Sequence, residues 1–314
     1  MAIQKVENLT FENKKIRMII AGFPGIGKTT LASSAPKPLL IDLDKGLDRV
    51  EPEYRVDRIV CENYDELIAD LSGDLNGYET LIIDTGGRLF DFLKPVVISD
   101  DPKNAKRNGS LSLMGYGANA TKYKDFLSFV DRLNKHLIII FHAKEEKDGD
   151  DTKLRIMIEG QMKDLIWQDM DLGGFIEMSG KKRTIGFTNC ERYFAKGTHG
   201  IKGVYEIPEL KEGEKNTFLT DLFNVYLKNL NDSTKNAQAE KEKYDTAMHL
   251  LAFIEKANSL EQINQFMQKT SEMEHALTSE RELKFAVNNK AKELGFVYDR
   301  EQNAYVINNA KPIK

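Results

Sequence analysis

The stretch "RMIIAGFPGIGKTTLA", residues Arg17–Ala32, joins an apolar run to a glycine-rich turn and then to a helix-compatible run. The turn fits the pattern G-x-x-x-x-G-K-[ST], from Gly22 to Thr29. Glycines let successive backbone N–H groups point toward phosphate oxygens. The pattern therefore predicts a strand, a phosphate-binding loop and a helix, in that order. A glycine turn that matched by chance would not need Lys-Thr after its last glycine.

This loop predicts a site for ATP and Mg²⁺. We expect Lys28 to reach the β and γ phosphates and the Thr29 hydroxyl to ligate Mg²⁺. The residues expected to contact the nucleotide are Gly22, Pro24, Gly25, Ile26, Gly27, Lys28, Thr29 and Thr30.

Short apolar runs alternate with amphipathic runs over the first 230 residues, which is typical of an α/β fold with a mostly parallel sheet flanked by helices. We expect strands at 16–21, 38–43, 80–84 and 137–141, helices at 65–72 and 120–134, and a hairpin around 179–182.

Acidic residues end two of the expected strands. Asp84 closes "YETLIID", where its carboxylate is expected to hold Mg²⁺ beside Thr29. Asp42 and Asp44 close "PLLIDLD". We expect Asp44 to orient and deprotonate the attacking water. The alternative, that Asp42 and Asp44 only cap the following turn, stays open on spacing alone.

Composition sets the outer limits. A chain of 314 residues with 41% hydrophobic and 30% charged residues is long enough for a core domain and a smaller second domain. It contains no apolar run of 18 residues, and its first residues are polar, so we expect a cytoplasmic protein without a membrane partner. The net charge of −4 requires that any nucleic-acid contact come from a local basic patch.

The chain changes character near residue 230, which divides it into an expected core at 1–230 and a small helical domain at 231–314. The polar run "KNLNDSTKNAQAEKEK" is a linker or the start of a helix. Ser259, Ser271 and Ser279 each open a capping box, and apolar residues recur at helical spacing. The run "FVYDREQNAYVI" predicts a short β segment after these helices.

Several segments together resemble the RecA-type ATPase core. They are Lys28-Thr29, "LLIDLDKGLD", "LIIDTGG" and "HLIIIFHAK". More closely, "SLMGYGANATKYKDFLSFVDRLNKHLIIIFHAKEE" and "MIEGQMKDLIWQDMDLGGFIEM" resemble phage-encoded nucleotide-binding proteins of that core, several of which are single-strand annealing or recombination ATPases.

The resemblance implies an ATPase that is slow or stimulated by DNA, a homo-oligomer in the form of a ring or filament, and single-stranded DNA as a partner. A single-strand-binding protein is a further candidate partner.

The resemblance also implies roles for three residues. Asp44 stands where RecA-like enzymes place a catalytic glutamate, and its shorter side chain puts the rate of hydrolysis in question more than ATP binding. His142 falls where that core places a sensor of the γ-phosphate, although a histidine satisfied at a strand end is the alternative. Lys196 resembles a lysine that completes the site of a neighbouring subunit.

A basic segment, Pro102–Lys124, follows the strand that ends in Asp84, where RecA-like proteins carry a DNA-contacting loop. It contains no acid, and we expect it to contact phosphates through its cations and unpaired bases through its tyrosines. The residues expected to bind DNA are Lys103, Lys106, Arg107, Tyr116, Lys122, Tyr123 and Lys124. The alternative is a solvated loop with incidental lysines. The loop "AKEEKDGDDTK" after His142 is acidic and is expected to repel phosphate.

Two classes of function follow from the sequence. The first is a recombination ATPase that assembles on single-stranded DNA and promotes annealing or strand pairing. The second is a P-loop ATPase of another role, such as a helicase loader, a partner-remodelling or packaging ATPase, or a small-molecule kinase. A kinase would usually carry an arginine-rich lid over the phosphates, and no such cluster stands near the loop in the sequence.

Overall fold

The computed structural model describes residues 9–149, 151–159, 162–210 and 213–308. Its contacts divide the chain into two compact units. One is Phe11–Leu230, and the other holds the remaining described residues. Each unit is considered by itself below.

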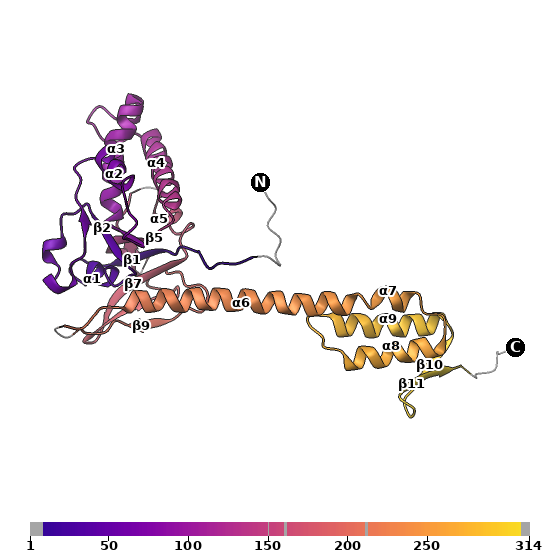
Figure 1. The fold of residues 1–314 in the computed structure, drawn as a ribbon. Helices are drawn as coiled ribbons and strands as arrows, with labels where there is room; N and C mark the ends of the chain where they lie inside the picture. Colours follow the sequence, from indigo (N-terminus) through magenta and orange to yellow (C-terminus); the bar gives the residue numbers. More distant parts are fainter. Residues whose placement is uncertain (1–8, 150, 160–161, 211–212, 309–314) are drawn as a thin grey trace. The chain divides into compact units, whose positions relative to one another are not determined.

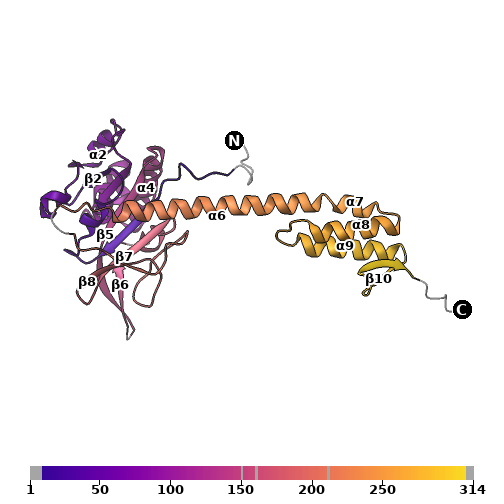
Figure 2. The ribbon, with the colours of Figure 1, turned by 60° about the horizontal axis from the view of Figure 1, so that its bottom comes forward.

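The first unit is built around a nine-stranded sheet with the order β3-β2-β4-β5-β1-β7-β8-β9, in which β6 pairs with β5 outside this path. The six neighbouring strands β3, β2, β4, β5, β1 and β7 are parallel to one another. In contrast, β8, β9 and β6 pair antiparallel with their neighbours (Figure 2). The expected mostly parallel sheet is therefore confirmed. The bounds are β1 Arg17–Gly22, β2 Pro38–Asp42, β3 Arg58–Ile59, β4 Thr80–Asp84, β5 His136–Asp148, β6 Asp151–Ile156, β7 Leu172–Ser179, β8 Lys182–Gly186 and β9 Val204–Glu206.

Helices cover both faces of this sheet (Figure 1). Apolar side chains of α2, α3 and α4 fill one buried cluster with β2, β4 and β5. Side chains of α1 and of the first part of α6 fill a second cluster with β1 and β8. The sequence produces this arrangement because buried parallel strands are apolar on both faces. The bounds are α1 Lys28–Ala32, α2 Tyr64–Leu71, α3 Gly86–Asp100, α4 Leu113–Arg132, α5 Met162–Leu165 and α6 Phe218–Met248.

Two expected loops are partly regular structure. The basic segment that begins at Pro102 becomes helical at Leu113, because the Ser112 side chain accepts the Gly115 N–H and starts α4. The acidic segment after His142 belongs to the antiparallel β5–β6 hairpin, in which Ala143 pairs with Ile156. The expectation of simple loops was wrong at both places.

The second unit contains three further helices and a hairpin packed around their own apolar cluster. They are α7 Leu251–Glu255, α8 Leu260–Glu272, α9 Ser279–Glu293, β10 Phe296–Asp299 and β11 Ala304–Ile307. The polar run near residue 230 lies inside α6. The N-cap at Ser259 is confirmed, since its side chain accepts the Gln262 N–H, whereas the Gln262 side chain accepts the N–H of Asn258. The box at Ser271 was wrong, because Ser271 lies in α8 and bonds back to the Met267 carbonyl.

A buried histidine, His136, is the first residue of β5. His136 is 5% exposed, its Nδ1 accepts the Ile16 N–H at 2.9 Å, and its ring lies 5.1 Å from that of Phe223. Burial, together with the nearby charge of Lys15, lowers the pKa of His136 to about 4. His136 is therefore neutral in the folded protein near pH 7.

We expect acid to destabilise the first unit through His136. Below the unfolded pKa of about 6.5, the unfolded chain binds a proton that the folded chain binds only near pH 4. The free energy of unfolding should then fall by about 1.4 kcal/mol per pH unit in this window. Fluorescence of Trp167, the only tryptophan, follows urea unfolding of this unit. The variant His136→Asn keeps an acceptor at the same position, and it should lose less stability between pH 6.5 and 4. Parallel losses in both proteins would refute the assignment.

Candidate nucleotide site

The phosphate loop connects the end of β1 at Gly22 to the start of α1 at Lys28. Two of its glycines take positive φ values, 77° at Gly25 and 90° at Gly27. Side chains with a β-carbon rarely adopt this conformation, so the glycines are required by the turn itself. The strand, loop and helix predicted from the sequence are present in that order.

Lys28 extends from the first turn of α1 into the loop and is 5% exposed. Its Nζ donates to the Phe23 carbonyl at 2.8 Å. Burial lowers the pKa of Lys28 to about 8, against the opposing attraction of Asp84 and Asp44. The ammonium is thus removed from water and placed where the negative charge of phosphates would stabilise it.

Thr29 and Asp84 meet across the edge of the sheet. The Thr29 hydroxyl donates to Asp84 Oδ2 at 2.6 Å. Burial raises the pKa of Asp84, and the nearby carboxylate of Asp44 raises it further, while the bond from Thr29 opposes both. A hydroxyl and a carboxylate beside a phosphate loop fit Mg²⁺, which binds through few protein oxygens together with phosphates and water.

The two acids at the end of β2 and just after it have different tasks. Asp42 is 1% exposed and accepts the backbone N–H groups of Gly46 and Leu47 at 2.8 and 3.2 Å. It also pairs with Arg58 at 2.7 Å. Asp42 therefore stabilises the turn after β2, as the capping alternative proposed. In the described part of the chain, the Asp44 side chain accepts no hydrogen bond from a backbone N–H of this turn.

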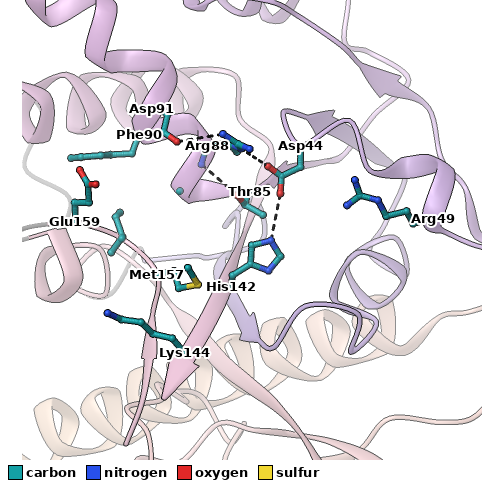
Figure 3. Close-up of a pocket in the computed structure, with 12 residues that line it drawn as sticks. Asp44, Arg49, Thr85, Arg88, Phe90, Asp91, His142, Lys144, Met157 and Glu159 are labelled. Carbon is teal, nitrogen blue, oxygen red and sulfur yellow. Dashed lines mark hydrogen bonds and ion pairs between the residues drawn. The ribbon is translucent and has the colours of Figure 1, made fainter. Parts of the chain in front are cut away.

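Asp44 instead faces His142, which lies within β5. Its carboxylate lies 3.0 Å from Arg88 Nε and 3.5 Å from His142 Nε2 (Figure 3). The hydrogen bond with His142 holds the pKa of Asp44 below its usual value, burial opposes this, and the bond from Arg88 lowers the pKa further. Asp44 is a carboxylate near pH 7, able to accept a hydrogen bond from water. In the β1–β5 register His142 stands opposite Gly22, the first residue of the loop pattern.

A cavity of about 480 Å³ opens beside Asp44 and His142. Figure 3 shows Arg88 and Thr85 on its wall with Asp44, and Lys144 and Met157 on the side of His142. The sequence analysis did not select Arg88 or Arg49, which also lines the cavity. Arg88 had a local signal, because it stands four residues after Asp84 and faces the same strand edge from α3.

The residues expected to bind DNA differ in their burial and in their partners. Tyr123 is fully buried, and its ring lies 6.4 Å from that of Phe90, so it cannot stack on a base; this expectation was wrong. Tyr116 is half-buried against the same cluster, and Lys122 pairs with Asp100 at 3.2 Å. The remaining cations of the segment, all exposed, are Lys103, Lys106, Arg107 and Lys124.

Lys196 bonds within its own chain. Its Nζ donates to the carbonyls of Trp167 and Gln168 at 3.2 and 3.3 Å. Its role at a neighbouring subunit stays a prediction.

A mostly parallel sheet, a phosphate loop at the end of its β1, and a carboxylate at the end of β4 define a P-loop nucleoside triphosphatase. Residues 14–199 match the family described as AAA domain, and the chain belongs to that family as a P-loop ATPase of the AAA type. No curated protein matches.

Among solved structures, the chain is similar to the ATPase EscN, solved with its central stalk EscO from the type III secretion system of enteropathogenic E. coli. The match has 11% identity and a TM-score of 0.33, and it covers 87% of this chain and 66% of that chain. Within the described residues, no helix is both long and apolar enough to cross a membrane.

The two carboxylates should respond differently to amidation. Asp84→Asn should lower the Mg²⁺-dependent affinity for nucleotide, because a metal-binding oxygen loses its charge. Asp44→Asn should preserve affinity and reduce kcat by about 100-fold or more, the usual contribution of a general base. Titration with a fluorescent ATP analogue, with and without Mg²⁺, and steady-state turnover measure the two effects. Equal losses of affinity in both variants would contradict this division of roles.

Proposed function

We propose that this protein is a Mg²⁺-dependent ATPase in which Asp44 activates the attacking water. The observation that carries the proposal is the position of Asp44. Its backbone N–H donates to the Asp84 carbonyl at 3.1 Å, while its carboxylate faces His142 and the cavity. Asp44 is therefore fixed next to the candidate metal ligand, with space beside it for water.

Each residue has a separate task in this reaction. The Lys28 ammonium offsets the charge of the β and γ phosphates, and the loop N–H groups orient them. Thr29 and Asp84 would hold Mg²⁺, which neutralises charge on the phosphate oxygens. Asp44 accepts a proton from the attacking water. His142, held at 3.5 Å from Asp44, orients that carboxylate and is our candidate sensor of the γ-phosphate.

Lys28→Ala tests the proposal at its centre. The variant should fold, since the Lys28 side chain makes one hydrogen bond to a loop carbonyl, and ATP turnover should become undetectable. Release of phosphate is the measurement, with unfolding followed by Trp167 fluorescence as the control. Unchanged turnover in a folded variant would exclude this loop as the site of hydrolysis.

A second proposal concerns single-stranded DNA. The turn between α3 and α4 carries Lys103, Lys106 and Arg107, all exposed, and none of these side chains has a carboxylate partner in the described chain. Such a cluster suits phosphates of an unpaired strand. Together with the resemblance to phage-encoded recombination ATPases, it supports a homo-oligomer that binds single-stranded DNA and promotes annealing or strand pairing.

Replacing Lys103, Lys106 and Arg107 by Ala should weaken binding to single strands of every sequence. The slope of log affinity against log salt should decrease by about 0.7 for each lost phosphate contact. Gel shifts at several salt concentrations measure both effects, and Lys202→Ala, which changes an exposed lysine outside this segment, is the control. If the triple variant keeps the parent's affinity and slope, the turn is not the DNA site.

The other roles of a P-loop ATPase make different predictions. A recombination ATPase should change its turnover or its particle size when single-stranded DNA is added. A helicase loader, a packaging ATPase or a small-molecule kinase should show neither change with DNA alone. Turnover and light scattering, each with and without DNA, separate these classes.

A further inference from the structure

An arginine of β8 lies on the same face of the sheet as α1. Ile185 and Phe187 pack in the buried cluster that contains Leu31 and Ala32 of α1. Side chains of a strand alternate between its two faces, so Arg183, two residues before Ile185, also points to the α1 side. Lys182 points to the opposite side, where it pairs with Glu206 at 2.8 Å.

The register of the strands brings Arg183 to the level of the phosphate loop. Gly22, the last residue of β1, pairs with Ile176 of β7. Arg183 pairs with Met178, two residues farther along β7. Because β1 and β7 are parallel, Arg183 lies beyond the end of β1, where the chain enters the loop.

The guanidinium of Arg183 lies directly against that loop. A β-carbon added to Gly27 would clash with Arg183 Nη1, so the absence of a side chain at Gly27 provides the space that the guanidinium fills. Gly27 immediately precedes Lys28, the lysine of the loop pattern. Two cations from distant parts of the chain therefore lie along one short turn.

Among the described residues, no acid pairs with this arginine. Arg183 is half-buried, and its side chain forms no hydrogen bond or ion pair within the residues that the structure describes. A guanidinium offers five N–H donors, and leaving them unsatisfied in a half-buried position is unfavourable. An anion with several oxygen acceptors would satisfy the donors and offset both charges.

We propose that Arg183 binds the phosphates of the nucleotide held by the loop, from the same chain that supplies Lys28. Arginine suits this task because its planar fork donates two parallel hydrogen bonds to phosphate oxygens. The proposal rests on the assignment of the loop as the ATP site. It adds a phosphate ligand from the β7–β8 hairpin, which the G-x-x-x-x-G-K-[ST] pattern does not include.

The test compares two probes that share three phosphates, a non-hydrolysable ATP analogue and inorganic triphosphate. Each displaces a fluorescent ATP analogue from the full chain in the presence of Mg²⁺. Arg183→Gln should raise the Kd of both probes by about tenfold or more, since it removes hydrogen bonds to charged phosphate oxygens. Arg183→Lys should recover part of the affinity, because it restores the charge without the fork. Lys182→Gln, on the opposite face, should bind both probes like the parent.

The outcomes separate phosphate binding from packing. If Arg183→Gln binds both probes like the parent, the guanidinium only packs against the loop and the proposal is wrong. A loss for the ATP analogue alone would place Arg183 at the base or ribose, which also overturns it. Trp167 fluorescence shows whether Arg183→Gln melts at a lower temperature than the parent in the absence of ligand. If it does, Arg183→Lys becomes the test of phosphate binding. The proposal then requires that Arg183→Lys bind both probes more weakly than the parent. If the parent binds neither probe, the ATPase proposal itself fails.

Discussion

The hydrogen bond from Thr29 to Asp84 is the contact on which the geometry of the site depends. It joins the first turn of α1 to the end of β4, two elements that are not consecutive in the chain. The same Asp84 accepts, at its backbone carbonyl, the N–H groups of Leu43 and Asp44 at 2.9 and 3.1 Å. One residue at the edge of the sheet thereby fixes both the phosphate loop and the carboxylate that faces the cavity.

Burial explains why these groups are suited to a ligand of mixed charge. It raises the pKa of Asp84 and lowers the pKa of Lys28, because each charged form has lost part of its hydration. The nearby carboxylate of Asp44 raises the pKa of Asp84 further, so a divalent cation would relieve both effects at that end. Phosphate oxygens would do the same for Lys28. The site is therefore electrostatically complementary to a metal–phosphate pair.

The sequence predicted those parts of the site that are local. The loop, the apolar strands and the acid at the end of β4 all follow from short patterns, and the structure contains each of them. Spacing could not distinguish Asp42 from Asp44, because the difference depends on the turn at Gly46 and on Arg58 of a neighbouring strand. The burial of Tyr123 did have a signal, since Tyr123, Phe126, Leu127 and Val130 recur at helical spacing. Arg183 had none, because only the register of β7 with β1 and β8 brings it to the loop.

The strand order assigns different chemistry to the two sides of the loop. β5, which carries His142, is the neighbour of β1 on one side, and on the other side β7 is followed by β8, which carries Arg183. Asp44, Arg88 and the cavity lie on the β5 side, so the proposed activation of water belongs there. The antiparallel turn between β7 and β8 matters on the opposite side. Because β8 reverses direction, its first residues, rather than its last, lie at the edge where the parallel strands end. A short hairpin can therefore place a cation beside Gly27 without interrupting the apolar core that Ile185 and Phe187 share with α1.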